Sequence, residues 1–195
     1  MKMIFISMLL VVFNNLYLSA NVKEQEILNN LTQKQGKDRI DYLNQVSKDM
    51  REDNPQNAIS YINEALQLSR QSGYYQGEGQ ALLNLGVIKS VLGNNSKAEE
   101  TFNQALNLYK QYSDKSGIIK TTISLGHIQT IKGNYRNALI NLTQAFKMSK
   151  ENNFKEETAL ASMGLGQLYE EMKDHNKALE YLSISVKLMK KLNNK

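Results

Sequence analysis

The chain contains no cysteine, only one proline and no block of five or more like charges. The lack of cysteine excludes disulfides, thiol catalysis and cysteine-ligated zinc or iron–sulfur sites. Because proline is nearly absent and alternating runs of Val, Ile and Thr are missing after residue 20, we expect an all-helical protein. The formal net charge of +5 is spread along the sequence. The basic stripe of a nucleic-acid binder is therefore missing, and we expect no nucleic-acid partner.

Residue patterns of enzyme active sites are also missing. The only two histidines, His127 and His175, are far apart in the sequence, and neither has a neighbour at metal-ligand spacing. Neither G-x-S-x-G nor the phosphate-binding G-x-x-x-x-G-K-[ST] motif occurs. Adjacent acids such as Glu156 and Glu157 point about 100° apart on a helix, so we predict that they are solvated. The sequence favours a protein that is not an enzyme and that uses no cofactor or metal.

The first twenty residues differ in character from the rest. A single lysine precedes an apolar stretch from Met3 to Phe13, and the segment ends in the small residues Ser19 and Ala20. This arrangement resembles a secretory signal peptide, because its apolar stretch is too short to cross a bilayer as a helix. We expect cleavage near Ala20 and export to the periplasm or the exterior. The alternative is an uncleaved membrane anchor, and only then would a membrane be a partner.

After residue 20 one pattern recurs every forty residues. Residues 85–106 and 125–146 are identical at eight of 22 aligned positions, and a third copy follows from residue 165. An upstream copy is degenerate, with Val46 where the others have glycine. Each copy has an amphipathic segment, a turn such as Gly93-Asn94, and a second amphipathic segment. Each copy therefore predicts a helical hairpin, and the hairpins must stack to bury their second faces.

Small residues occupy fixed positions in these copies. A glycine lies in the middle of the first helix, where it costs about 1 kcal/mol relative to alanine. An alanine follows twelve residues later, and two copies have a second alanine seven residues beyond that. We predict that the glycine faces the first alanine, which would let the two helix backbones approach closely. The residues given this structural role are Gly86, Ala98, Ala105, Gly126, Ala138, Ala145, Gly166 and Ala178.

This combination of residues resembles the tetratricopeptide repeat over roughly residues 36–192. The matching residues in one copy are Leu85, Gly86, Ala98, Phe102 and Ala105. The forty-residue period differs from the basic repeat of about 34 residues, and it is similar to that of a long-repeat subgroup that includes bacterial sensor and regulator proteins. The resemblance implies an all-α fold, a right-handed solenoid of stacked helical hairpins.

The repeat register also divides the chain into units. We expect a signal peptide at 1–20, an N-terminal helix or linker at 21–35, a degenerate repeat at 36–74, and repeats at 75–114, 115–154 and 155–195. The last helix keeps apolar residues, including Leu179 and Val186, that should pack against a following repeat. Three explanations stay open: this helix is the cap, it mediates self-association, or the chain belongs to a longer protein.

The resemblance implies binding to a protein or peptide. Repeats of this kind hold a peptide or helix of a partner in a concave groove lined by their first helices. We therefore expect an exported protein–protein interaction scaffold. The alternative is the N-terminal sensor region of a membrane-bound histidine kinase or transcriptional regulator whose output domain is missing from this chain. The partner-binding positions carried over from the family are Leu43, Leu83, Val87, Lys120, Ile123, His127, Met163, Gln167 and Glu170.

One row within this set is apolar in all four copies. It consists of Leu43, Leu83, Ile123 and Met163. An exposed apolar row would contact apolar side chains of a partner. The alternative is that the four residues pack between neighbouring first helices, and the sequence does not decide between the two.

Overall fold

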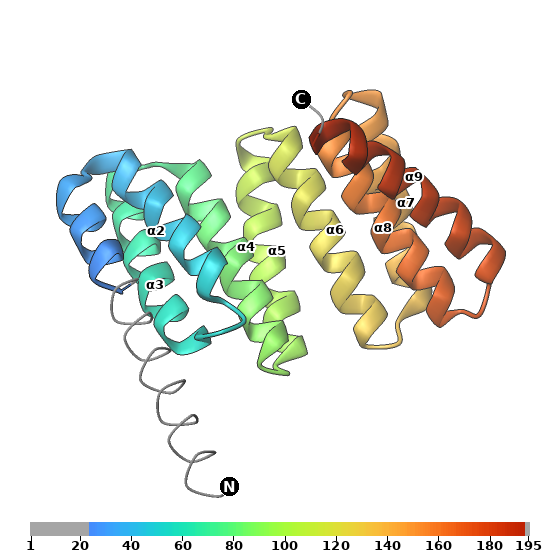
Figure 1. Cartoon of the computed structure of the whole chain (residues 1–195), viewed down its shortest axis with the longest axis horizontal. Coiled ribbons are helices and arrows are strands. Elements are labelled where there is room, and N and C mark those ends of the chain that lie inside the picture. Colours follow the sequence, from blue (N-terminus) through green and yellow to red (C-terminus); the bar gives the residue numbers. More distant parts are fainter. Residues whose placement is uncertain (1–23, 194–195) are drawn as a thin grey trace, which may run out of the picture.

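The computed structural model describes residues 24–193, which form α-helices and contain no strand (Figure 1). The expected all-α solenoid of helical hairpins is confirmed. Residues 24–33 are helical, and the following helices are α2 (Gly36–Met50), α3 (Pro55–Ser72), α4 (Tyr75–Val91), α5 (Asn95–Gln111), α6 (Lys115–Ile131), α7 (Tyr135–Glu151), α8 (Lys155–Glu171) and α9 (His175–Asn193). The predicted signal peptide lies outside the described residues. Within residues 24–193 no helix combines the length and the apolar character that a membrane crossing requires.

The helices from α4 to α8 have a uniform length. Helices α4 to α8 each contain 17 residues. From α3 onward, each connection has one residue in the left-handed conformation, at positions 73, 93, 113, 133, 153 and 173. In the turn after α4 the amide of Gly93 donates to Ser90 O at 2.9 Å, and the amide of Asn94 donates to Lys89 O at 2.8 Å. These bonds pair the last carbonyls of the helix and reverse the chain in a fixed direction.

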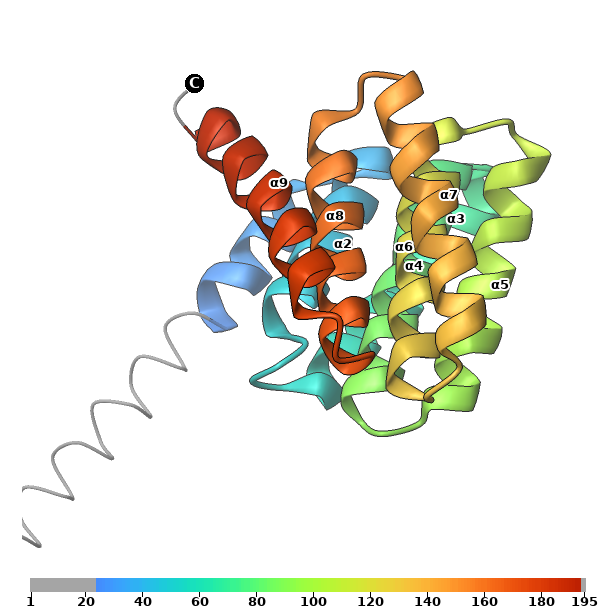
Figure 2. The same cartoon turned by 90° about the vertical axis from the view of Figure 1, so that its right-hand side faces the viewer.

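The packing of the helices defines an inner and an outer side. The first helices of the hairpins, α2, α4, α6 and α8, pack side by side in chain order. Among the described residues, the second helices α3, α5, α7 and α9 make no such contacts with one another; each packs on its own first helix, and α3, α5 and α7 also pack on the next first helix. Figure 2 shows α3, α5 and α7 together on one side of the row of first helices. The first helices therefore form a continuous inner surface.

The mid-helix glycines face a large apolar side chain rather than the predicted alanine. A Cβ on Gly86 would lie 2.3 Å from Cε1 of Phe102, and a Cβ on Gly126 would lie 2.5 Å from Cγ of Leu142. On Gly166 the nearest atom would be Cγ of Leu182. The alanines are buried. Only at Gly166 is an alanine atom, the carbonyl oxygen of Ala178 at 3.3 Å, among the nearest atoms. Helical side chains lean toward the N-terminus, so the residue one turn after the alanine covers the site of contact.

Tyr109 forms a contact that no other repeat has in the same position. It lies at the end of α5 and is 4% exposed. A Cβ on Gly79 of α4 would lie 2.3 Å from its ring, and a Cβ on Gly117 of α6 would lie 2.2 Å from it. The ring therefore fills space left free by a glycine on each side. Forty residues before and after Tyr109 the chain has the buried serines Ser69 and Ser149.

Helical residues 24–33 cover the start of the first hairpin. Ile27 and Leu31 are buried against it. The Arg39 guanidinium donates to the carbonyl of Leu31 and pairs with Glu64 of α3 at 2.6 Å. This segment thus packs on the first hairpin.

Candidate functional site

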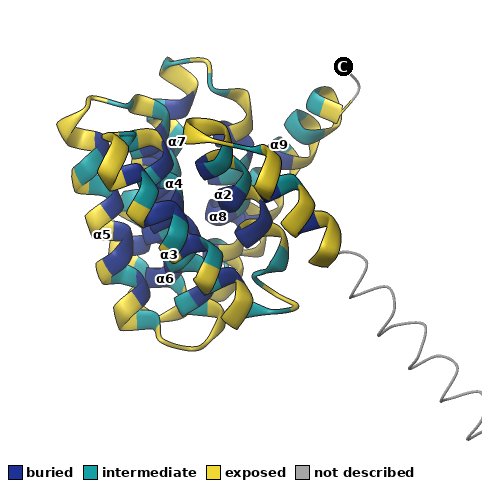
Figure 3. Cartoon of the chain, turned by 90° about the vertical axis from the view of Figure 1, so that its left-hand side faces the viewer, coloured by how far each residue is buried: buried dark blue, intermediate teal, exposed yellow. Residues whose placement is uncertain are grey.

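The inner surface formed by the first helices is the candidate binding surface. In Figure 3 the buried residues follow the sides of the helices that face one another, and exposed residues gather at the turns. Leu43, Leu83 and Ile123 are 0%, 6% and 5% exposed. Met163 on α8 is half-buried. For the first three residues of the apolar row, the structure thus favours packing between neighbouring first helices over contact with a partner.

The reason for this burial is the close contact between successive first helices. Because α2, α4, α6 and α8 pack directly on one another, one apolar position per helix falls between each pair. Met163 occupies this position in the last first helix, which has no further first helix beside it among the described residues. Met163 is therefore the member of the row that a partner can reach.

A buried polar network joins α2 to α4. The Asn84 side chain donates to the Asn44 carbonyl at 2.8 Å and to Ser47 Oγ at 3.1 Å, while the Asn44 side chain donates to the Gly77 carbonyl at 3.0 Å. Gln80 donates to Asn84 Oδ1 at 3.1 Å. Asn44 Oδ1 is buried without a hydrogen-bond partner. No role was predicted for these asparagines from the sequence, although their forty-residue spacing was a usable signal.

Asn44 and Gln80 also line a small polar hollow of 160 Å³ between α2 and α4, together with Asp41, Gln45 and Lys48. Side-chain amides can both donate and accept hydrogen bonds. This end of the inner surface can therefore bind the peptide groups of an extended chain as well as polar side chains.

The junction of α6 and α8 is held by a buried acid. Glu157 is 6% exposed, accepts a hydrogen bond from Ser116 Oγ at 2.9 Å and lies 3.5 Å from Lys120 Nζ. Of the two adjacent acids predicted to be solvated, Glu156 is exposed and Glu157 is not. The prediction is wrong for Glu157, because the two side chains point in different directions and this one meets α6. The predicted binding residue Lys120 is thus engaged in an ion pair between helices.

The predicted positions Val87, His127 and Gln167 form an accessible row across α4, α6 and α8. Val87 and His127 are half-buried, and Gln167 is exposed. The imidazole of His127 lies beside the backbone of Gly164, since a Cβ there would be 3.3 Å from both Cε1 and Nε2. Burial lowers the pKa of His127, which favours the neutral ring. Glu170 is exposed and lies 3.1 Å from His175 Nδ1.

The inner surface thus combines a few apolar side chains with hydrogen-bonding groups and a neutral imidazole. Within residues 24–193, no group of three or more His, Cys, Asp or Glu side chains is placed to hold a metal ion. Such a surface is suited to noncovalent recognition of an elongated ligand.

Hairpins of equal length, with first helices inside and second helices outside, define a helical-repeat protein. Comparison with known families gives the particular class. Tetratricopeptide repeat models match residues 49–111 and 160–188. Residues 49–111 and 160–188 thus belong to the tetratricopeptide repeat family.

Solved structures share this fold at low sequence identity. Aspartyl phosphate phosphatase F from Bacillus subtilis is similar with a TM-score of 0.70 and 15% identity, over 82% of this chain and 42% of that one. A Rap protein complexed with competence and sporulation factor has a TM-score of 0.62 and 16% identity, over 91% and 60% of the two chains. BtubC from P. vanneervenii has a TM-score of 0.63 and 16% identity, over 88% and 74%. No curated protein matches the sequence. The chain thus spans about half the length of the first two structures.

Proposed function

We propose that this protein is an interaction scaffold that binds a peptide or helix of a partner protein on its inner surface. The observation that carries the proposal is the accessible row of Val87, His127 and Gln167, which continues across three first helices. Side chains of three different kinds at one register position give each hairpin a different contact. A ligand lying across the row therefore meets apolar, aromatic nitrogen and amide groups in a fixed order.

The surroundings of this row indicate the chemistry of the ligand. Met163 offers an accessible apolar contact on α8, while Gln45 and Gln80 offer hydrogen-bonding groups at the α2–α4 end. Such a surface suits a segment with one or two apolar side chains and an accessible backbone. The Rap structure complexed with competence and sporulation factor supports the idea that a related fold serves as a binding platform.

The test is a selection of binders from a random peptide library displayed on phage, using residues 21–195 as bait. Met163→Glu, which places a charge on the inner surface, is expected to abolish binding of the selected peptides. The matched control is Ile140→Glu, because Ile140 is an exposed apolar residue of the outer helix α7. Selected peptides that bind the Met163→Glu protein as well as the wild type would contradict the proposal.

We also propose that the scaffold is exported and that the segment preceding residue 21 directs the export. The support is the sequence pattern of residues 1–20 alone. Measuring the intact mass of the native protein in fractionated cells tests this. A secreted or periplasmic species that begins at residue 21 is the expected result, and a cytosolic species that retains Met1 would contradict it.

The alternative role, as the sensor region of a larger membrane-bound regulator, has one supporting observation. The last helix exposes Leu179 to 69% and Val186 to 53%. These apolar side chains lie where a further helix, or a second copy of the chain, would bury them. The same mass measurement separates the two roles, because a larger membrane-bound species is expected only for the regulator.

A further inference from the structure

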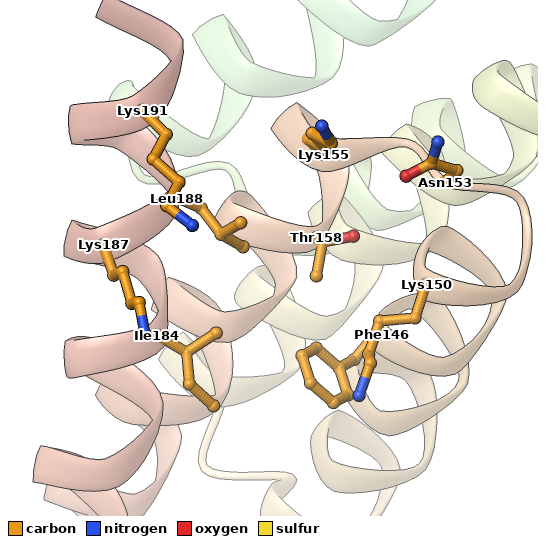
Figure 4. A pocket seen from close by; sticks show the side chains of 9 residues that line it. All are labelled: Phe146, Lys150, Asn153, Lys155, Thr158, Ile184, Lys187, Leu188 and Lys191. Atoms are coloured by element: carbon orange, nitrogen blue, oxygen red, sulfur yellow. The ribbon is translucent and has the colours of Figure 1, made fainter. Parts of the chain in front are cut away.

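A groove of 460 Å³ lies between the second halves of α7 and α9, over the start of α8 (Figure 4). Phe146 of α7 faces Ile184 and Leu188 of α9 across it, and Thr158 of α8 lies between them. The three apolar side chains are half-buried. The groove is distinct from the inner surface, because its walls are two of the outer second helices.

Four lysines surround this apolar floor. They are Lys150, Lys155, Lys187 and Lys191, and all are exposed. None of the nine residues that line the groove is acidic, and none of the four lysines forms an ion pair with a residue in the part of the chain that the structure describes. The Nζ of Lys150 lies 5.2 Å from the centre of the Phe146 ring. The groove thus has a positive rim above an apolar floor.

Comparison with the preceding repeat shows that this composition is particular to the last one. At the same register, forty residues earlier, Gln144 and Glu151 stand in place of Ile184 and Lys191. Glu151 lies 3.9 Å from Lys147, so α7 has an acid–lysine pair at this position. In α9 two lysines stand four residues apart, an arrangement of like charges that destabilises a helix. A cost of this kind is compensated when an anionic partner binds.

We propose that this groove binds an acidic segment of a partner protein. One apolar side chain of the segment lies between Phe146, Ile184 and Leu188, and its flanking carboxylates face the lysines. The volume falls within the range of about 300–1,000 Å³ that is usual for ligand pockets. The floor is recessed between two helices, so a narrow chain with a protruding side chain reaches it and a flat bilayer surface does not. This site is independent of the inner-surface function proposed above.

The test measures the fluorescence anisotropy of a labelled synthetic peptide with a central phenylalanine flanked on both sides by glutamates. The variant Ile184→Gln with Lys191→Glu gives the last repeat the residues of the preceding one. It is expected to bind about fivefold more weakly or worse, because Lys191→Glu replaces an attraction to the peptide's carboxylates by a repulsion and Ile184→Gln removes an apolar contact. The control, Ile140→Gln with Lys97→Glu, makes the same chemical changes at exposed positions elsewhere and is expected to bind normally.

A second variant, Lys187→Gln with Lys191→Gln, changes only exposed charges and should retain the fold, which circular dichroism checks. It is also expected to weaken binding. Equal loss in the Ile140→Gln, Lys97→Glu control, or equal binding of a peptide with glutamines in place of the glutamates, would overturn the proposal. So would binding to phosphatidylserine vesicles without binding to the peptide. Met163→Glu should leave this peptide's affinity unchanged, which separates failure here from failure of the inner-surface function.

Discussion

The contact of Tyr109 with Gly79 and Gly117 allows a quantitative test of how the repeats are joined. Replacing Gly117 by alanine would place a Cβ 2.2 Å from the ring of Tyr109. The ring has no room to withdraw, because a Cβ position on Gly79 lies 2.3 Å from it on the other side. Burial also raises the pKa of the Tyr109 hydroxyl, so the side chain stays neutral in the folded protein. We therefore expect the alanine to strain the α5–α6 contact.

The magnitudes follow from the packing. Overpacking of a core costs about 1–3 kcal/mol. Alanine is favoured over glycine within a helix by up to about 1 kcal/mol, which offsets part of this cost. Gly117→Ala should therefore lower the free energy of unfolding by about 1–2 kcal/mol. Tyr109→Ser removes a buried ring and should cost about 3–4 kcal/mol. In the Tyr109→Ser protein the added methyl group meets no ring, and Gly117→Ala should be neutral or stabilising. The coupling between the two substitutions should therefore be about 2 kcal/mol.

The assay is a double-mutant cycle on the free energy of unfolding, measured by urea denaturation with circular dichroism. Gly79→Ala serves as a second cycle, since Tyr109→Ser should relieve it in the same way. The slopes of the denaturation curves must agree among variants for the comparison to hold. Additive effects, within about 0.5 kcal/mol, would refute the argument that the ring occupies the space left by both glycines.

Two further predictions concern single residues. Lys173 has a left-handed backbone with φ of 61°, so Lys173→Gly should raise the free energy of unfolding by about 0.5–1 kcal/mol, and a loss of stability would contradict the assigned conformation. Burial lowers the pKa of His127, so the unfolded chain takes up a proton that the folded chain excludes, and stability should fall as the pH drops below about 6.5. The His127→Gln variant should lose less stability than the wild type between about pH 7 and pH 5.5, and an equal loss in both proteins, measured as melting temperature, would contradict this.

The turns show how far the sequence could predict the fold. Gly93 and Gly133 identify helix ends because glycine adopts the left-handed conformation without steric cost. Ser113, Asn153 and Lys173 adopt the same conformation at equivalent positions, but only Asn153 among these gives a local signal. At Ser113 and Lys173 the stacking of hairpins of equal length imposes the left-handed conformation. The repeat period, rather than the residue itself, was the information that located these turns.

The candidate site was harder to predict. The register assigned residues to the inner side, but whether Leu43 or Ile123 is covered depends on how closely successive first helices approach. That distance depends on contacts between residues far apart in the sequence, such as Asn84 of α4 with Asn44 of α2. Glu157 illustrates the same limit, since its burial requires Ser116 and Lys120 of the preceding repeat. Single-sequence patterns describe one helix face and do not describe the neighbour that covers it.

The even spacing of helices and turns has a consequence for how such a chain evolves. A backbone with identical junctions every forty residues accepts duplication or loss of a whole hairpin without any new loop. Side chains restrict this freedom, because removal of residues 115–154 would bring Tyr109 against Glu157 in place of Gly117. The backbone therefore makes the hairpins interchangeable, while side-chain contacts such as that of Tyr109 with Gly117 require particular hairpins to be neighbours.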